Sequence, residues 1–206
     1  MLSRYKYILW DFDGVIINSN PARTLGFKKV LEDFPNDQVE KLLDFHNDNG
    51  GLSRYVKFRY FYEEIRGEEV DEHQIQNLAN QFSLIMKQIL TNPQLLIQDS
   101  VSFIQHNCSQ IQMHIVSGSD GQELRFLCEK LGISNCFKSI SGSPTPKTEL
   151  VRYLVESEII DPQITCLIGD SINDFEAAND NNIDFFGFNN PELIGFGIGF
   201  INDFKF

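Results

Sequence analysis

The chain has 206 residues, of which 42% are hydrophobic, 22% charged and 12% aromatic. This composition is that of a globular protein and excludes a disordered chain, a collagen-like fibre and a small disulfide-stabilised scaffold. The formal net charge of −12 opposes binding to a phosphate backbone, so we expect no nucleic-acid partner, although a local basic pocket for a small anion remains compatible with it.

The N-terminal region reaches a predicted strand within a few residues. The run 5–10 is apolar and is followed directly by Asp11 and Asp13. A secretory signal needs an apolar segment of about 7–15 residues after a basic start, and this region offers none of that length. The four cysteines show neither close pairing nor the density of a disulfide framework. We therefore expect a cytoplasmic protein with reduced thiols.

The long segment after the first strand has helical patterning and no convincing strand. It is much longer than a crossover between parallel strands requires, so we predict a helical cap over residues 19–93, inserted into a core of residues 1–18 and 94–206. Three apolar faces with helical spacing indicate helices here. These faces are Phe27, Val30, Leu31 and Phe34; Phe58, Phe61, Tyr62 and Ile65; and Leu78, Phe82, Ile85, Met86 and Ile89.

The rest of the chain alternates short apolar runs with helical patterns, which predicts an α/β fold with a Rossmann-like, mostly parallel sheet flanked by helices. About five strands are expected. They correspond to the runs 5–10, 113–116, 137–140, 166–168 and 183–188, with helical patterns at 123–131 and 174–178. The apolar segment 193–201 is too short to cross a bilayer, so it indicates a packed tail or a dimer contact rather than a membrane partner.

Polar residues follow three of the predicted strands, and ligands of open α/β sheets bind at this end of the strands. Several carboxylates brought together would raise one another's pKa values, so such a site needs a cation, and oxygen ligands suit Mg²⁺. An ionised aspartate beside that cation can act as a nucleophile and form an acyl phosphate. The residues concerned are Asp11, Asp13, Ser117, Gly118, Asp170 and Asp174.

Four groups of residues, taken in chain order, resemble the four motifs of the haloacid dehalogenase superfamily. The resemblance spans the whole chain, and the helical insertion after the first motif is similar to the cap of the phosphoglycolate phosphatase and β-phosphoglucomutase branch. The motif residues are Asp11-Phe12-Asp13-Gly14-Val15-Ile16, Ser117-Gly118-Ser119, Lys147, and Gly169-Asp170-Ser171-Ile172-Asn173-Asp174.

The resemblance implies a catalytic role for two of the aspartates. Asp11 would attack phosphorus, while Asp13 would protonate the leaving oxygen and then activate water. Ser117, through its hydroxyl, and Gly118, through its backbone amide, would hold the phosphoryl oxygens. Lys147 would neutralise the charge that develops during transfer.

The resemblance also implies a set of metal ligands. The side chains of Asp11 and Asp170 and the backbone carbonyl of Asp13 would bind Mg²⁺, with Asp174 in or beside the metal shell. Because Asp13 is a carboxylate, the chain differs from the family's dehalogenases, which lack one there, and from its ion pumps, which generally carry threonine.

The function implied is that of a Mg²⁺-dependent phosphatase, a phosphoric monoester hydrolase. Its partner would be a small phosphorylated metabolite, such as a sugar phosphate or phosphoglycolate, and it would act through an aspartyl-phosphate intermediate. Two alternatives are a phosphosugar mutase and a catalytically silent protein that binds a phosphorylated ligand. The sequence leaves a monomer and a homodimer open.

One motif departs from the pattern of relatives with this cap. In many of them the lysine directly precedes Pro-x-Pro, whereas here Ser143 precedes Pro144-Thr145-Pro146 and Lys147 follows. Pro146 before Lys147 predicts the start of a helix, from which a lysine can still reach a phosphoryl oxygen. The alternative is a solvated lysine in the first turn.

Substrate selectivity is expected to lie in the cap. A glycine-rich loop leads to Ser53, a predicted helix N-cap, and to a basic cluster of Arg54, Lys57 and Arg59. Arg54 lies in a segment that resembles the Gly-x-Ser-Arg of β-phosphoglucomutases, which implies contact with substrate. The alternative is that the cluster forms surface ion pairs with Glu63, Glu64 or Glu68. Arg23 stands where such mutases typically carry histidine, and it is a second candidate for substrate contact.

Overall fold

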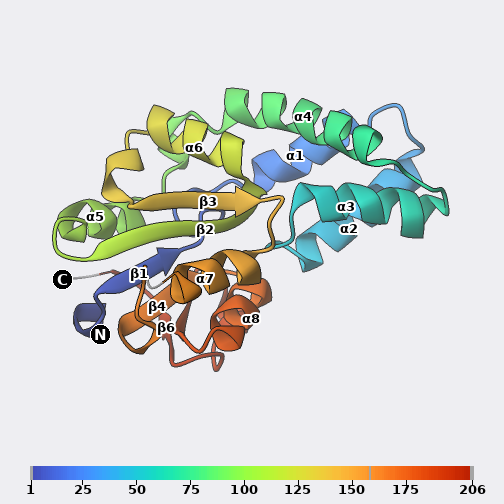
Figure 1. The fold of residues 1–206 in the computed structure, drawn as a ribbon. Coiled ribbons are helices and arrows are strands. Elements are labelled where there is room, and N and C mark those ends of the chain that lie inside the picture. Colours follow the sequence, from blue (N-terminus) through green and yellow to red (C-terminus); the bar gives the residue numbers. More distant parts are fainter. Residues whose placement is uncertain (1, 158, 205–206) are drawn as a thin grey trace.

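The computed structural model describes residues 2–157 and 159–204. Within these ranges the chain forms a six-stranded, all-parallel sheet with the strand order β3-β2-β1-β4-β5-β6 (Figure 1). The strands are β1 (Tyr7–Trp10), β2 (Gln112–Asp120), β3 (Ser139–Ser143), β4 (Thr165–Gly169), β5 (Asp184–Phe188) and β6 (Gly199–Ile201).

The first strand of the sequence lies at the centre of the sheet. Ile8 of β1 pairs with Met113 of β2 on one side and with Cys166 of β4 on the other. All three side chains are fully buried, as expected for parallel strands that are covered on both faces. Because β2, β1 and β4 are parallel neighbours, the residues that follow them gather at one edge of the sheet.

Four helices cover the two faces of the sheet. Successive strand residues point to opposite faces. Ile8 and Trp10 accordingly belong to the apolar cluster that includes α5 and α6 side chains, whereas Leu9 packs with side chains of α7 and α8. The helices are α5 (Gln98–Asn107) and α6 (Gly121–Lys130) on one face, and α7 (Lys147–Glu156) and α8 (Ile172–Asp180) on the other.

Four further helices lie beyond the arrowheads of β2 and β3 (Figure 1). Aromatic rings fill the space between them: Phe27 contacts Phe58 and Phe82, with ring centroids 5.3 and 4.6 Å apart. These helices are α1 (Asn20–Val30), α2 (Asn36–Asp48), α3 (Arg54–Tyr60), which continues into a π-helical turn (Phe61–Arg66), and α4 (Glu72–Ile89). Over the part of the chain that the structure describes, no helix combines the length and apolar character needed to span a bilayer.

The two connections between the sheet and the α1–α4 helices run side by side. Ile17 and Leu96 form an antiparallel bridge, and the amide of Asn18 donates to the carbonyl of Leu95 at 2.8 Å. The amide of Ile97 donates to the carbonyl of Ile16 at 2.9 Å. The α1–α4 helices are therefore joined to the sheet through two adjacent backbone segments.

The structure differs from the sequence prediction at both edges of the sheet. It has six strands rather than about five, because Gly199–Ile201 pairs with β5 instead of forming only a packed tail. Three residues carry too little alternation to indicate a strand. At the other edge, β3 begins at Ser139 and is mostly half-buried, so its sequence has weak apolar character. The α2 helix was not among the predicted faces, although Val39, Leu42, Leu43 and His46 repeat at helical spacing and are buried.

Candidate active site

The predicted motif residues gather at the edge where β1, β2 and β4 end. Asp11 directly follows β1, Ser117 lies in β2, and Asp170 directly follows β4. The buried strands β1 and β4 place Asp11 and Asp170 directly after their last residues, and Ser117 lies three residues before the end of β2. The strand order β2-β1-β4 makes these positions neighbours. Asp174 joins them from the first turn of α8.

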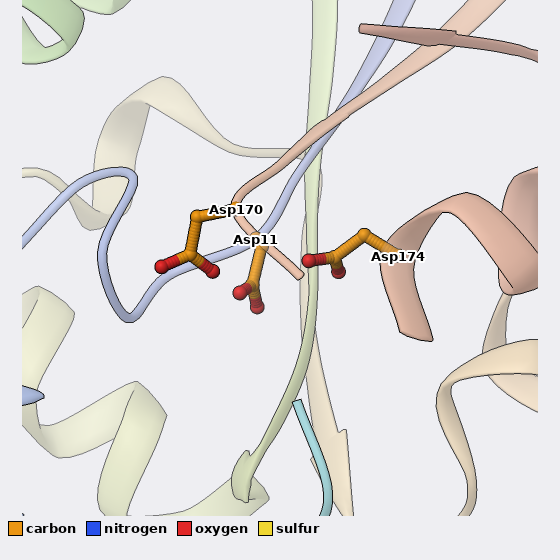
Figure 2. Close-up of side chains that lie close together, drawn as sticks. All are labelled: Asp11, Asp170 and Asp174. Carbon is orange, nitrogen blue, oxygen red and sulfur yellow. The ribbon is translucent and has the colours of Figure 1, made fainter. Parts of the chain in front are cut away.

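Three carboxylates form the centre of this site. One oxygen from each of Asp11, Asp170 and Asp174 lies within 4.8 Å of the others. Figure 2 shows Asp11 between the other two, each side chain coming from a different element. Burial, followed by the charge of Asp174, raises the pKa of Asp11 to about 7. Burial and the charges of Asp11 and Asp174 also raise the pKa of Asp170 well above its usual value.

The Lys147 ammonium lies among these carboxylates. Its Nζ is 3.0 Å from Asp11 Oδ1 and donates to Asp174 Oδ1. Burial alone would lower the pKa of Lys147, but Asp11 and Asp174 outweigh it and hold the pKa above its usual value. Lys147 is the first residue of α7, after Pro146, and is buried rather than solvated.

The carboxylate cluster fits a cation. One ammonium does not balance three carboxylates, and the buried Oδ1 of Asp11 makes no hydrogen bond although Lys147 is close. An all-oxygen set of this kind suits a hard divalent cation. Asp174 is already engaged, since its Oδ2 accepts hydrogen bonds from the amide and hydroxyl of Ser171 at 3.0 and 2.7 Å. It is therefore the least free of the three to bind an ion directly.

Glycine is required beside this cluster. Gly14 has a φ of +73°, a conformation that other residues rarely adopt, and a Cβ on it would lie 1.8 Å from Asp170 Oδ2. The turn after β1 can therefore approach Asp170 only because the side chain is missing. This explains why glycine follows the second aspartate of the first motif.

Asp13 is held by hydrogen-bond partners of its own rather than by the three carboxylates and Lys147. Its Oδ1 accepts a hydrogen bond from Arg23 Nε at 3.0 Å, and the hydroxyls of Ser19 and Ser119 donate to its two oxygens. Burial alone would raise the pKa of Asp13, but Arg23 and the two hydroxyls hold it below the usual value. Asp13 is thus ionised and firmly oriented in this arrangement.

A buried ion triad joins the α1–α4 helices to the sheet. Glu123 of α6 has no exposed surface and binds Arg23 Nη1 at 2.5 Å and Arg54 Nη1 at 2.6 Å. Burial alone would raise the pKa of Glu123, but the two guanidinium groups hold it below the usual value. Arg54 also donates to Ser83 at 2.7 Å. We call Arg23, Glu123 and Arg54 the arginine triad.

The basic cluster at the start of α3 divides into two kinds of residue. Ser53 caps the helix, because its hydroxyl accepts a hydrogen bond from the amide of Val56 at 3.4 Å. Arg59 is half-buried and pairs with the exposed Glu63 at 3.2 Å, which is the predicted surface pairing, and also with the exposed Glu72. Arg54 and Lys57 instead turn inward and are buried, so they do not pair with the predicted surface glutamates.

Ser117 and Gly118 lie against the loop that precedes α3. A Cβ on Gly118 would lie 2.2 Å from the carbonyl oxygen of Gly51, so only glycine permits this approach. The loop and the α1–α4 helices enclose an inner cavity of about 40 Å³ next to these residues. The inner cavity is lined by Asp11, Asp13, Arg23, His46, Gly51, Arg54, Lys57, Phe82, Ser117, Gly118 and Ser119, among others.

An outer cavity of about 510 Å³ shares part of this lining. Asp11, Asp13 and Asn20 border both cavities. The outer cavity continues past Asp170 and Asn173, so it is the wider of the two approaches to the carboxylate cluster.

Three residues of the site were not assigned a role from the sequence. Ser119 stands in the second motif, but its bond to Asp13 has no sequence signal. Glu123 reads as an ordinary first-turn glutamate of α6. His46 has no metal-ligand spacing, yet it borders the inner cavity and lies 2.8 Å from Lys57. The Ser119 and Glu123 contacts join residues 106 and 100 positions apart, and His46 and Lys57 lie on two different helices.

Comparison with known proteins gives consistent matches over nearly the whole chain. The model of a family described as haloacid dehalogenase-like hydrolase matches residues 8–188. A phosphoglycolate phosphatase from Colwellia psychrerythraea is 22% identical over 192 residues, which are 90% of this chain and 85% of that protein.

Solved structures share the fold at low sequence identity. A β-phosphoglucomutase from Clostridium difficile has a TM-score of 0.76 and 17% identity, covering 97% of this chain and 92% of that one. CbbY from Rhodobacter sphaeroides, in complex with xylulose-(1,5)bisphosphate, has a TM-score of 0.75 and 14% identity, covering 97% and 95%. Identities this low establish the shared fold and nothing finer.

Proposed function

Because the chain belongs to the haloacid dehalogenase-like hydrolase family, we propose that it is a Mg²⁺-dependent phosphatase of a small phosphorylated metabolite. The observation that carries the proposal is the arrangement of Asp11 and Asp13 at one edge of the sheet. Asp11 lies in a carboxylate cluster with a buried lysine, and Asp13 is oriented beside the cavity that reaches Ser117 and Gly118.

The proposed cation site is the carboxylate cluster. Asp11 and Asp170 would hold Mg²⁺ through their carboxylates, with the backbone carbonyl of Asp13 as a further ligand and Asp174 in or beside the metal shell. When bound, Mg²⁺ would neutralise the carboxylates and polarise the phosphoryl group. The excess of negative charge over the single ammonium of Lys147 supports this assignment.

The proposed chemistry passes through an aspartyl phosphate. A carboxylate oxygen of Asp11 would form a bond to phosphorus while the bond from phosphorus to the leaving oxygen breaks. Asp13 would give a proton to that oxygen and later take one from the attacking water. Since Arg23 stabilises the ionised form of Asp13, the structure favours the base step, and the acid step requires that the Arg23 contact loosens when substrate is bound.

Three other groups would hold the transferring phosphoryl oxygens. These are the Ser117 hydroxyl, the Gly118 amide and the Lys147 ammonium, which already lies 3.0 Å from Asp11 Oδ1. Such preset donors stabilise charge where it develops in the transition state. Because each is fixed by a strand or by a helix start, little reorganisation is needed during transfer.

Residues 19–93 would act as a cap over this site. The inner cavity, at about 40 Å³, is much smaller than the roughly 300–1,000 Å³ of typical small-molecule sites. Substrate entry therefore requires the α1–α4 helices to move away from Gly118, and the paired connections at Ile17 and Leu96 are where such a motion would pivot. Closure would then exclude bulk water.

A phosphosugar mutase is the second candidate, supported by the structural likeness to a β-phosphoglucomutase. Such a mutase would return the phosphoryl group to another hydroxyl of the sugar. Arg23 stands at the position where those mutases typically have histidine, and its ion pair with Asp13 disfavours this reading. A silent phospholigand-binding protein would not require both Asp11 and Asp13.

The test is phosphate release from phosphoglycolate, hexose phosphates, a pentulose bisphosphate and an aryl phosphate. Each is measured with Mg²⁺ and with a chelator. We expect release that requires Mg²⁺ and is lost in Asp11→Asn, while Asp33→Asn, which removes the same charge from an exposed position, retains it.

Release that persists in Asp11→Asn would disprove the nucleophile. An isomeric phosphosugar formed without free phosphate would establish the mutase. Binding of these compounds without any turnover, in folded protein supplied with Mg²⁺, would favour the silent binding protein.

A further inference from the structure

Lys57 is a buried cation that the proposed chemistry does not use. Its side chain is on α3, the residue is 2% exposed, and it borders the inner cavity. The ammonium contacts His46 Nδ1 at 2.8 Å and the carbonyl of Gly50 at 3.3 Å. Neither partner is a carboxylate, and no ion pair joins Lys57 to any acidic residue that the structure describes.

The neighbouring arginines differ from Lys57 in this respect. Arg23 pairs with Asp13 and Glu123, and Arg54 pairs with Glu123. Their charges are compensated by direct ion pairs, whereas Lys57 has no direct ion pair and only the more distant attraction of Asp13. Burying an ammonium without a counter-ion is costly, and a neutral side chain of similar size would avoid the cost.

The cost of burying the Lys57 ammonium appears as a lowered pKa. Burial, opposed by the charge of Asp13 and assisted by the charges of Arg23 and Arg54, lowers the pKa of Lys57 to about 7. Burial, followed by Lys57, lowers the pKa of His46 to about 3, so the imidazole is neutral and its Nδ1 can accept from the ammonium. An anion arriving beside Lys57 would restore the charged form.

The two cavities at the site differ in charge. Residues that border only the outer cavity include Asp48, Asp170 and Glu192, and none of its lining residues is lysine or arginine. The inner cavity has Arg23, Arg54 and Lys57 in its lining. A substrate whose phosphoryl group lies at Asp11 would therefore place a second negative group in the inner cavity rather than the outer one.

We propose that Lys57 binds the non-reacting anionic group of the substrate, which is either a carboxylate or a second phosphate. This inference rests on the proposed phosphatase function, and it narrows the substrate to phosphate esters with two anionic groups. Asp13, Ser117 and Gly118 border the same cavity as Lys57, so one molecule bound there after the α1–α4 helices have moved away from Gly118 can reach both ends. His46 keeps the ammonium at the cavity wall.

The test compares substrates with one and with two anionic groups. The kcat/KM ratio is measured for phosphoglycolate over an aryl phosphate, and for a pentulose bisphosphate over the corresponding monophosphate, in the Mg²⁺-loaded protein. Loss of a charge-assisted contact is expected to reduce binding about 10–100-fold. In Lys57→Met we therefore expect at least one of the two ratios to fall at least about tenfold, through KM.

A matched control makes the result specific. Arg59→Met removes a positive charge from the same helix at a position outside the inner-cavity lining and should leave both ratios within about twofold of wild type. Which ratio falls in Lys57→Met identifies the group that Lys57 binds: phosphoglycolate for a carboxylate, the bisphosphate for a second phosphate. If Lys57→Met does not fold, Lys57→Gln replaces it.

Direct binding provides a second readout. Calorimetric titration of phosphoglycolate and of the bisphosphate into Asp11→Asn and into Asp11→Asn/Lys57→Met should show the same selective loss. Ratios that change less than about threefold in Lys57→Met, or a fall of equal size in Arg59→Met, would overturn the proposal. If wild-type protein releases no phosphate from any compound, the proposed function fails first, which is a different outcome.

Discussion

The arginine triad offers a stringent test of how the α1–α4 helices are held on the sheet. Glu123 has no exposed surface and is the shared partner of Arg23 and Arg54 at 2.5 and 2.6 Å. Glu123→Gln keeps the shape and removes the charge. Arg23 then retains the carboxylate of Asp13, but Arg54 keeps only neutral partners, among them the Ser83 hydroxyl and the Phe82 ring.

The expected loss of unfolding free energy in Glu123→Gln is large because the buried guanidinium of Arg54 loses its counter-ion. Removing one partner of a buried pair typically costs about 3–5 kcal/mol. For a domain of this size, about 2–4 °C is lost per kcal/mol, so the melting temperature should fall by about 6–20 °C. Urea and thermal unfolding at about pH 7 measure the free energy of unfolding and the melting temperature, respectively. Glu63→Gln, which removes the exposed partner of Arg59, should cost less than about 1 kcal/mol.

The effect also has a defined pH dependence. The arginines hold the pKa of Glu123 in the folded protein below its usual value of 4.5. Its stabilising contribution is therefore present above that value and is lost as the pH falls through the lower folded value. The difference in unfolding free energy between wild type and Glu123→Gln should shrink below about pH 4.

A double-mutant cycle tests whether the pair itself is responsible. Arg54→Met and Glu123→Gln should be less destabilising together than the sum of the two single changes, by at least about 1 kcal/mol. A Glu123→Gln variant that loses less than about 1 kcal/mol, or a cycle that is additive, would refute the reasoning.

Two further predictions concern the turn after β1 and the buried lysine. Gly14→Ala would place a methyl group 1.8 Å from Asp170 Oδ2, so we expect Mg²⁺-dependent phosphate release to fall at least about tenfold. Gly67→Ala is the control, because Gly67 has a φ of +68° and nothing near its Cβ. This control should retain phosphate release and lose only the about 1–3 kcal/mol of folding stability that the strained backbone costs. Lys57→Met should stabilise the protein by about 2 kcal/mol near pH 6: the depressed pKa of Lys57 corresponds to at most about 5 kcal/mol, which the lost His46 contact partly offsets. Because the folded pKa of about 7 lies below the ordinary 10.5, the cost of the charge is present below about pH 7 and fades as the pH approaches 10, where unfolding measurements should show the advantage gone.

The parallel core was largely predictable because short, local sequence patterns indicate its strands and helices. Each central strand is an apolar run that ends at a polar residue, and the patterns at 123–131 and 174–178 fall largely within α6 and α8. The edge strands were harder, since β3 is half-buried and β6 has only three residues. A short edge strand forms because it hydrogen-bonds to its neighbour. Its own sequence therefore gives little indication that it will be a strand.

The carboxylate cluster was foreseeable for a similar reason. Asp11 and Asp170 directly follow strands, and parallel neighbours bring such positions to one edge. The burial of Lys147 was not decided by the sequence, because a lysine in the first turn of a helix can point to solvent or inward. Packing of α7 and α8 on one face of the sheet places its ammonium against Asp174.

The sequence by itself determined which polar residues follow the apolar strands. It therefore determined which side chains could meet at the carboxylate cluster. Only the tertiary structure decided the partners of the cap cations. Arg23 and Arg54 meet Glu123 from 100 and 69 residues away. Lys57 lies on the same short helix as Arg54 and Arg59, yet it alone of the three is buried without a carboxylate. Burial and charge compensation depend on how separate elements pack. A local sequence pattern does not specify which distant residues will come into contact.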